Sequence, residues 1–575
     1  MITVNKNKLI DILLVIVSAL LTVLVYSVVL LTVNRGTSCD EGYYLLSYLP
    51  EQPLGWGISQ FFYIVRSLGL DSYDNALTLR YLRFVLSFAS LLFFALTSYR
   101  YLVVQFRSSI NKHLYISLVM LTGVLAYTFA SPVLYYDNIQ AILYFIVFGC
   151  LFMSVNSQPL LRVVFHALSG FFIVLAVFNY LPSGFLLLII YLILSVISEQ
   201  KQKSGSYLVN FIFLISGIIF GLLFYHYAVH NLFDSIQIIH SSFTTAQSGI
   251  TSHDNNSLLF KALMYVLELT IILIAFVVTG LTYFFLIKKY SAKASRLWFV
   301  NLLYLFIFLL VISQRNLFTT YYSHLIILPV SFLIAEIIFS GRTKKYSLNF
   351  KTMVLLLVFL FIPLAGAFGT NQLLSAKTLF FMPFWMVLFA LIYSVFNSEN
   401  KHTNMRLYLV IWIGVVVLSY IHLGYFTRFH YYYTPTSSKY ELSGNERFKS
   451  IKVSEWQKNF NEKAFHILNS KGFRKGDKIL AFYDNFITVY AVGGYVPQQL
   501  IYQFEVFTAN KKNIPETKVD YILIIQEQEK PMIDFLKDTN WNFPADYDRF
   551  DLGMASQNLP GEGYNSILFI RKSNN

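Results

Sequence analysis

Long apolar runs separated by short polar segments dominate the chain from Leu9 to Gly424. Each run has about 17 to 25 residues, which is long enough for a helix to cross the hydrocarbon core of a bilayer. The first run is too long for the apolar part of a signal peptide and lacks a small-residue cleavage site, so it predicts a retained helix. The pattern as a whole predicts a polytopic α-helical membrane protein.

About thirteen membrane-spanning helices are expected from these runs. They lie near residues 9–33, 78–98, 114–130, 138–155, 163–179, 182–198, 207–228, 258–287, 297–313, 321–340, 352–369, 377–396 and 407–425.

The basic residues between the spans predict an orientation, because loops rich in Lys and Arg remain cytoplasmic. One set of loops is basic and includes Lys6, Lys8, Arg100, Arg107, Lys112, Arg162, Lys201, Lys203, Lys288, Lys289, Lys293, Arg296, Arg342, Lys344, Lys345, Lys351, Lys401 and Arg406. The alternate loops hold few basic residues, of which Arg35, Arg66, Arg315 and Lys377 are the clearest. The N-terminus is therefore expected in the cytoplasm and the tail after Gly424 on the outer side.

Two segments are expected to form most of the outer surface. Within residues 34–77, the stretch LGWGISQFFYIVRSLGL (54–70) is apolar but too interrupted to span, and it favours a helix in the plane of the interface. Residues 426–575 are richer in charge and follow a transmembrane domain of residues 1–425. Helical patterns at 454–473 and 531–538 alternate there with strand-like runs at 478–484, 520–526 and 566–572. This alternation predicts a small α/β domain.

Composition and charge agree with this organisation. The chain of 575 residues is 56% hydrophobic and only 13% charged, about half the charged share of a typical soluble protein. The net charge of +14 is largely explained by the cytoplasmic loops, so no nucleic-acid partner is expected. The loop 229–257 is rich in Ser, Thr, Gly and Asn, which favours a mobile lid. His166, within a predicted span, is expected to form an interhelical hydrogen bond.

Two adjacent carboxylates follow the first span, in TSCDEGYYL (37–45). Ser38 and Glu41 have the spacing of a helix capping box, and acids in a first helical turn complement the helix dipole. The alternative is catalytic: a carboxylate at the mouth of a membrane cavity could accept a proton from a hydroxyl group. The two readings are compatible, because a capped helix would hold Asp40 rigidly, and Tyr43 would then face the same cavity.

Other outer turns add acids and bases. In SPVLYYDNIQ (131–140), Asp137 either caps the fourth span or acts as a second acid, and Tyr136 and Asn138 flank it. The second span opens with LRYLRF (79–84), in which Arg80 and Arg83 lie on one helical face. Arg83 is a turn inside the membrane, where charged residues usually face a cavity or a partner.

Two further turns supply candidate ligands. The stretch QRNLFTTYYSHLIILP (314–329) contains Arg315, Tyr321, Tyr322 and His324, and an interfacial polar role is the more common one for such a histidine. In GTNQLLSAK (369–377), Thr370 and Asn371 suit a tight turn but could also bind a sugar by hydrogen bonds.

Acids and bases in short loops on one side of a membrane suggest transfer of a sugar from a polyprenyl phosphate carrier. The polyprenyl phosphate that leaves in this reaction is an anion, and Arg side chains stabilise it by charge-assisted hydrogen bonds. The chain shows no glycine-rich phosphate loop of a soluble nucleotide-binding domain.

The chain resembles the GT-C integral-membrane glycosyltransferases, in particular the branch of protein O-mannosyltransferases and bacterial aminoarabinose transferases of lipid A. The resemblance covers essentially the whole chain: the number of spans, the Asp-Glu pair after the first span and the external C-terminal domain. It also includes the turn containing Ser131, Pro132 and Asp137, and the stretch containing Tyr322, His324 and Pro329.

The resemblance implies that Asp40 is the catalytic base of an inverting single displacement, with Glu41 orienting the acceptor or shaping the loop and Asp137 as a second acid. It implies that Arg80, Arg83, Arg315 and His324 bind the donor phosphate. The substrate cavity would include Tyr43, Tyr136, Asn138, Tyr321, Tyr322, Thr370 and Asn371. If a divalent cation takes part, Asp40 and Asp137 are its candidate ligands; no other cofactor is implied.

The expected setting is the inner membrane of a bacterium, with the C-terminal domain in the periplasm and a role in the cell envelope, for example on lipopolysaccharide. The partners would be the bilayer, a polyprenyl-phosphate-linked sugar, and a glycan, lipid or protein acceptor. A flippase or transporter of lipid-linked saccharide and an O-antigen polymerase or ligase remain as alternatives. The segment 484–497 would either dock the acceptor or cover the cavity.

Overall fold

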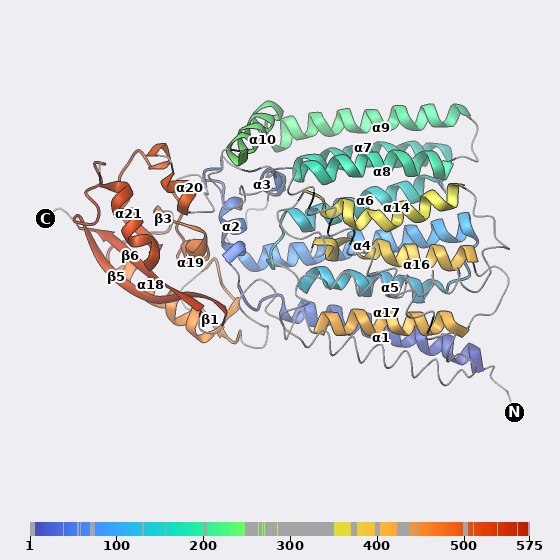
Figure 1. Ribbon diagram of the computed structural model, residues 1–575, viewed down its shortest axis with the longest axis horizontal. Coiled ribbons are helices and arrows are strands. Elements are labelled where there is room, and N and C mark those ends of the chain that lie inside the picture. Colours follow the sequence, from blue (N-terminus) through green and yellow to red (C-terminus); the bar gives the residue numbers. More distant parts are fainter. Residues whose placement is uncertain are drawn as a thin grey trace.

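The computed structural model describes residues 6–247, 350–369, 377–396, 403–421 and 438–572, with isolated residues between 248 and 349. Short gaps within these ranges are residues 38, 55, 56, 58, 70–74, 129, 130, 156, 200–203, 443–445, 498–503, 510, 538, 560 and 561. The described part consists of a bundle of long helices and a smaller C-terminal region that extends from one end of the bundle (Figure 1). We call that end of the bundle the domain end.

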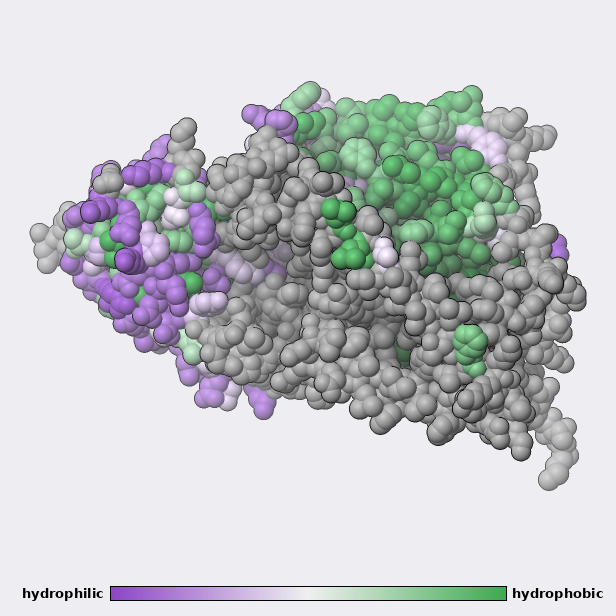
Figure 2. Space-filling model, viewed as in Figure 1, coloured by the Kyte–Doolittle hydropathy of each residue, from purple (hydrophilic) through white to green (hydrophobic). Residues whose placement is uncertain are grey.

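Long apolar helices that run roughly side by side build the bundle (Figure 1). They are α1 (Lys6–Thr32), α4 (Ala76–Phe106), α5 (Lys112–Gly123), α6 (Tyr136–Val155), α7 (Pro159–Asn179), α8 (Leu181–Glu199), α9 (Ser204–Phe224), α14 (Phe350–Ala367), α16 (Pro383–Phe396) and α17 (Thr403–Ile421). Seven helices in the described ranges are long and apolar enough to cross a membrane. On the face shown in Figure 2, the described part of the bundle surface is mostly hydrophobic, whereas the C-terminal region is mostly hydrophilic. The chain is therefore a multi-pass membrane protein.

Helix α6 is the most deeply buried of the seven long apolar helices in the described ranges, and we call it the central helix. In its apolar window 83% of residues are buried inside the protein, against 22% for α9 and its extension at the edge. A buried polar chain crosses from α6 to its neighbours: Asn179 donates to the Gln140 side chain at 2.8 Å, and Gln140 donates to Ser183 at 3.1 Å. Such bonds fix helices against one another in an apolar medium. The first turn of α6, which carries Asp137, is consequently held in place.

Most of the predicted spans overlap helices of the described bundle. The spans expected at 258–287, 297–313 and 321–340 lie outside the described residues, apart from isolated positions, so the number thirteen stays a prediction. The expected interhelical bond of His166 is confirmed, because its Nδ1 lies 2.7 Å from the Tyr191 hydroxyl, between α7 and α8.

Within the stretch 54–70, expected as an interfacial helix, the described residues are helical over a shorter range, and its place at a membrane interface stays a prediction. Only α3 (Phe61–Arg66) is helical among the described residues of this stretch, and Phe61, Phe62 and Val65 are buried in the protein. The reason is Arg66, whose guanidinium donates to the carbonyl oxygens of Ser47, Leu49 and Gln52 at 3.0, 2.6 and 3.1 Å. These bonds satisfy carbonyls near the end of the preceding helix and fold the segment back onto the protein.

The predicted lid loop at 229–257 is largely helical in its described part. A π-helical turn (Tyr225–Val229) leads into α10 (Leu232–Gln247), whose start is capped by Asn231 through the backbone N–H groups of Phe233 and Asp234. The His230 ring stacks on Tyr63 with centroids 3.7 Å apart. Residues 248–257 lie outside the described part of the chain.

The C-terminal region, residues 438–572, folds around a four-stranded sheet, and we call it the C-terminal domain. Its strands are β3 (Ile479–Ala481), β4 (Tyr521–Ile525), β5 (Tyr547–Leu559) and β6 (Glu562–Arg571), in the order β3-β4-β6-β5. Strands β3 and β4 are parallel, whereas β6 is antiparallel to both of its neighbours. A short pair, β1 (Tyr440–Glu441) and β2 (Lys452–Val453), lies beside the sheet region.

Helices cover the sheet of the C-terminal domain. They are α18 (Glu455–Ser470), α19 (Phe486–Ala491), α20 (Phe504–Thr508) and α21 (Glu529–Leu536), with the short 3-10 turn η6 (Tyr483–Asn485) before α19. Alternate residues of each strand face opposite sides. Ala481, Leu523 and Leu568 belong to the continuous apolar core that includes the bundle, whereas Leu480, Ile522 and Ile567 form a separate cluster on the other face. The apolar core of the bundle therefore continues through the domain to one face of the sheet.

The domain docks on α2 (Cys39–Tyr48), a short helix at the domain end of the bundle (Figure 1). Gly42 on α2 meets the backbone of Ile487 in α19 so closely that a Cβ atom would lie 2.2 Å from the Ile487 nitrogen. Beyond α2, Gln52 forms two hydrogen bonds with the backbone of Val496, both at 3.0 Å. Only glycine allows the two backbones to approach this closely.

The substitution Gly42→Ala should loosen this contact, because one added methyl group forces the two helices apart. We expect a loss of about 1–3 kcal/mol in stability, the usual cost of overpacking. Hydrogen exchange of the α19 amides should become faster in the variant. The control is Gly221→Ala in α9, where a Cβ would meet Val174 within the bundle; α19 should remain protected there. Equal α19 protection in both variants would contradict the docking role of Gly42.

Candidate functional site

Asp40 and Glu41 lie in the first turn of α2, where acidic side chains complement the helix dipole. Consecutive residues of a helix point about 100° apart. The two carboxylates therefore face different neighbours, and their surroundings differ accordingly. Ser38, the predicted cap of this helix, lies outside the described residues.

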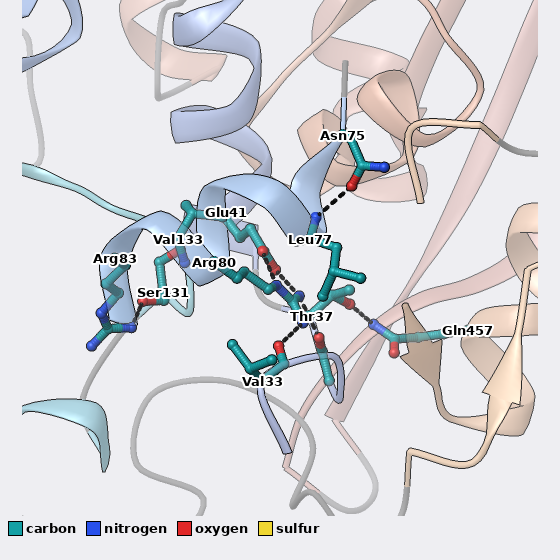
Figure 3. Close-up of polar contacts among 11 residues, drawn as sticks. Val33, Thr37, Glu41, Asn75, Leu77, Arg80, Arg83, Ser131, Val133 and Gln457 are labelled. Atoms are coloured by element: carbon teal, nitrogen blue, oxygen red, sulfur yellow. Dashed lines mark hydrogen bonds and ion pairs between the residues drawn. The ribbon is translucent and has the colours of Figure 1, made fainter. Parts of the chain in front are cut away.

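Glu41 is fully buried and forms a bidentate ion pair with Arg80 of α4. Arg80 Nε donates to Oε1 and Arg80 Nη2 donates to Oε2, each at 2.8 Å (Figure 3). The same guanidinium donates to the carbonyl oxygens of Val33 at 3.0 Å and Gly36 at 2.6 Å. A planar guanidinium suits this arrangement because its donors form a rigid fork. The pair joins α2, α4 and the chain that follows α1.

These contacts give Arg80 a structural role that differs from the predicted binding of a phosphate. Its guanidinium has 0% exposure, and its donors are directed at Glu41 and two carbonyl groups. An anion would have to displace a buried carboxylate to reach it, which is costly because a buried charge would lose its partner. Of the two roles predicted for Glu41, the ion pair supports the shaping of the loop.

Asp40 turns toward the C-terminal domain. Its carboxylate is buried, and the Tyr483 hydroxyl donates to Oδ1 at 2.5 Å. Tyr483 lies in η6 of the domain, just before the segment 484–497, and it is a site residue that sequence reasoning missed. The phenol of Tyr43, one helical turn further along α2, stacks near Phe486 of the domain at 6.4 Å between centroids. Burial raises the pKa of Tyr43 to about 12, with the Asp40 charge acting in the same direction, so Tyr43 stays protonated.

Asp137, in the first turn of α6, forms a buried ion pair with Lys377. Lys377 immediately precedes the 3-10 turn η4 (Thr378–Phe381), and its ammonium group also lies 3.4 Å from the Tyr136 hydroxyl. The rings of Tyr136 and Tyr135 surround the ammonium group, with centroids at 5.1 and 5.8 Å. In the sequence, the only signal of Lys377 is that it is one of the few basic residues of the predicted outer loops.

Arg83 is buried and supports the turn that precedes α6. It donates to the carbonyl oxygen of Ser131 (Figure 3). It also donates to the carbonyl oxygen of Ala126 at 2.8 Å, and its guanidinium lies 5.3 Å from the centre of the Tyr127 ring. Its Nε atom is buried and has no hydrogen-bond partner within the described residues. The Oδ1 atom of Asn138 is also buried without such a partner in that part of the chain. Among the described residues, Arg83 therefore keeps an unused donor and Asn138, which follows Asp137 in the chain, keeps an unused acceptor.

Several predicted site residues lie outside the described part of the chain. They are Arg315, Tyr321, Tyr322, His324, Thr370 and Asn371. Among the described residues, no group of three or more His, Cys, Asp and Glu side chains is arranged to hold a metal ion. Asp40 and Asp137, the predicted cation ligands, are hydrogen-bonded to Tyr483 and paired with Lys377 respectively.

The structure brings together Asp40, Asp137 and Lys377 at the domain end of the bundle, with tyrosine rings between the elements that carry them. Tyr44 of α2 stacks on Tyr135 at 5.0 Å and lies 6.4 Å from Tyr136. Such a cluster has a carboxylate that can accept a proton, a cation that can bind an anion, and aromatic faces that can pack against a sugar or a lipid.

The class defined by fold and site is a multi-pass membrane protein with a charged, tyrosine-rich cluster where its helix bundle meets an α/β domain. No family model matches the chain. No curated protein matches it either. Among solved structures, it is similar to the crystal structure of the oligosaccharyltransferase of Archaeoglobus fulgidus in complex with Zn and sulfate, with 12% sequence identity and a TM-score of 0.43. The alignment covers 94% of this chain and 71% of that chain. At this similarity, function has to be argued from the site.

Removal of one partner of the Asp137–Lys377 pair should destabilise the protein, because the other charge is left buried and alone. For Lys377→Met we expect a loss of about 3–5 kcal/mol in detergent-solubilised protein, measured by thermal or chemical unfolding. The double variant Asp137→Leu/Lys377→Met should recover most of that loss. If the double variant were as unstable as the sum of both single variants, the pair would not be the stabilising unit.

Asp484, next to Tyr483, should make the stability of the domain depend on pH. Burial, together with the nearby Glu505 and Glu527, raises the pKa of Asp484 to about 6. The folded state thus favours the protonated form, and this favourable contribution is lost as the pH rises from about 4 through about 6. Asp484→Asn should therefore stabilise the domain at pH 7.5, by at most about 3 kcal/mol, and should have little effect near pH 4.

The control for Asp484 is Asp546→Asn, because hydrogen bonds from Lys518 and Asn542 lower the pKa of Asp546. The Asp546→Asn substitution should change the stability of the domain in the opposite direction: a small destabilisation at neutral pH that disappears in acid. Thermal midpoints across this pH range, followed by tryptophan fluorescence, measure both variants. If the effect of Asp484→Asn on stability were independent of pH, the raised pKa of Asp484 would be contradicted.

Proposed function

We propose that the protein is a glycosyltransferase that moves a sugar from a polyprenyl phosphate carrier to an acceptor hydroxyl group. The observation that carries the proposal is the position of Asp40, a buried carboxylate that is oriented by a hydrogen bond at the domain end of a membrane bundle. Its helix α2 packs through Tyr44 on Tyr135 and Tyr136, the rings that surround Lys377 of the Asp137–Lys377 pair. A donor of this kind keeps its lipid tail in the bilayer and its sugar phosphate at the membrane–water interface. A site at the domain end of the bundle, between the apolar helices and the hydrophilic domain, suits such a donor.

The proposed reaction is an inverting single displacement. Asp40 accepts the proton of the acceptor hydroxyl while its oxygen attacks the anomeric carbon, and the bond to the phosphate oxygen breaks with its electron pair on the polyprenyl phosphate. A general base held at the reacting hydroxyl contributes about 10²- to 10⁴-fold in rate. Preorganised cations stabilise the departing anion at no further cost of reorganisation.

The described residues suggest Lys377 and Arg83 as the cations for the phosphate. Lys377 is paired with Asp137 at rest, and a phosphate would bind its ammonium group beside Asp137 rather than in its place, so that neither buried charge loses its partner. Arg83 retains a buried N–H without a partner in the described part of the chain, one turn along α4 from Arg80. Arg315 and His324 keep their predicted place among the phosphate ligands. Arg80 leaves that group because Glu41 binds it.

The proposal includes the orientation predicted from the basic loops. The N-terminus would be cytoplasmic, and the domain end with the C-terminal domain would be extracytoplasmic, in the inner membrane of a bacterium. Tyr43, Tyr136 and Asn138 would contribute to the sugar cavity, together with Tyr321, Tyr322, Thr370 and Asn371. The acceptor would be a glycan, a lipid or a protein that reaches this side of the membrane.

Asp40→Asn should abolish transfer, because an amide cannot take the proton, while folding and expression remain intact. The experiment complements a deletion strain with the wild-type or variant gene and compares its envelope glycans by mass spectrometry. It then measures turnover of purified protein on polyprenyl phosphate carrying the sugar that the deletion strain lacks. We expect a loss of at least about 10²-fold.

The matched control is Asp548→Asn, which removes an exposed carboxylate of the domain that pairs with Lys471 at 3.4 Å. This variant should turn over at the wild-type rate. Near-wild-type turnover of Asp40→Asn would remove Asp40 from the base role. A flippase of lipid-linked saccharide would instead need no positioned base and would move the donor across the membrane without cleaving it.

A further inference from the structure

The contact between Tyr483 and Asp40 joins two parts of the chain that are 443 residues apart. The donor belongs to the C-terminal domain, and the acceptor belongs to a helix at the domain end of the bundle. A carboxylate at the start of a helix could satisfy its hydrogen bonds locally. Here part of its hydrogen bonding comes from the domain, so the surroundings of Asp40 depend on where the domain sits.

The backbone around Tyr483 is anchored on both sides. Asn485 N–H donates to the Phe482 carbonyl at 2.9 Å and closes the turn η6, and the Ser566 hydroxyl of β6 lies 3.0 Å from the Asn485 side-chain oxygen. On the other side, Ile487 touches Gly42, two residues after Asp40. The hydroxyl of Tyr483 is therefore held in register with α2 by the sheet and by the docking contact together.

Further bonds tie the same face of the domain to the bundle. Gln457 of α18 donates to the Thr37 hydroxyl at 2.7 Å (Figure 3), and the Gly36 N–H donates to the Lys452 carbonyl at 2.8 Å. Arg447 accepts the Ala76 N–H at its carbonyl oxygen, at 3.0 Å. Two of these contacts involve residues that precede α2 in the chain, and one involves a residue that follows it. The domain therefore holds the segment that carries Asp40 between itself and the bundle.

We propose that Tyr483 is a positioning residue for Asp40, so that the C-terminal domain completes the catalytic site. This inference rests on the proposed function. Tyr483 holds Oδ1 of Asp40 and sets the orientation of the carboxylate toward the acceptor hydroxyl. Tyr483 itself neither gains nor loses a proton: the proton of the acceptor goes to Asp40, and the electron pair of the broken bond goes to the polyprenyl phosphate.

The size of the expected effect follows from the nature of the bond. A hydrogen bond to a charged group contributes more than a neutral one, and its removal near a reacting group costs about 10- to 100-fold. A base that is misoriented by a small angle loses rate in the chemical step but does not change the binding of the lipid carrier. The change should therefore fall on kcat rather than on KM.

The test compares Tyr483→Phe with Tyr547→Phe in the full-length protein. Both variants remove one phenolic hydroxyl from the domain, but the Tyr547 hydroxyl donates to the Val519 carbonyl at 2.8 Å inside the domain. The substrate is polyprenyl phosphate carrying the sugar identified from the deletion strain. For Tyr483→Phe we expect kcat to fall about 10- to 100-fold with KM for the donor within about twofold, and α19 amides to keep their protection from hydrogen exchange. Tyr547→Phe should have wild-type kcat.

A second arm combines Tyr483→Phe with Asp40→Asn. If Tyr483 acts through Asp40, its loss should have no further effect on the residual turnover of the Asp40→Asn variant. A wild-type kcat in Tyr483→Phe overturns the inference. An equal fall of kcat in Tyr547→Phe also overturns it, and so does a fall of kcat in Tyr483→Phe that comes with faster hydrogen exchange of the α19 amides. These outcomes leave the proposed function standing as long as Asp40→Asn is inactive. High turnover of Asp40→Asn would instead overturn the proposed function.

Discussion

The buried ion pair between Glu41 and Arg80 is the interaction on which the arrangement of the site depends. It ties α2 to α4 and to the carbonyl groups that follow α1, with no exposure to solvent. A bidentate carboxylate–guanidinium pair restrains both position and rotation, and loss of either partner would leave an uncompensated charge in an apolar setting. The place of Asp40, the residue immediately before Glu41, follows from this restraint.

The two adjacent carboxylates thus divide two tasks between them. Glu41 faces the bundle and fixes α2, while Asp40 faces the domain and receives a hydrogen bond from Tyr483. The rotation of about 100° between consecutive helical residues makes this division possible. A single carboxylate at this position could not both hold the helix through a buried ion pair and remain oriented for chemistry.

The C-terminal domain is consequently part of the site. Its sheet shares an apolar core with the bundle, and the close approach of Gly42 and Ile487 sets the distance at which Tyr483 meets α2. At the central helix, the Asp137–Lys377 pair provides a second charged element next to a group of tyrosine rings. An anionic, lipid-linked donor at the domain end of the bundle would meet cations and aromatic faces, whereas the hydrocarbon core of the bilayer offers neither.

The sequence by itself determined the membrane class, the bundle helices, the strands β3, β4 and β6, and the acids Asp40, Asp137 and Glu41 as points of interest, because hydrophobic period and residue type are local properties. Only the tertiary structure decided the partners: Lys377 for Asp137, Tyr483 for Asp40, and Glu41 for Arg80. Only the structure shows that Arg66 holds the stretch 54–70 against the protein by hydrogen bonds, and that part of 229–257 forms the helix α10. The physical reason is that a pairing across 240 or 443 residues depends on how the helices pack against one another. The hydrophobic period of a helix shows which face is buried, but it does not show which distant side chain that face will meet.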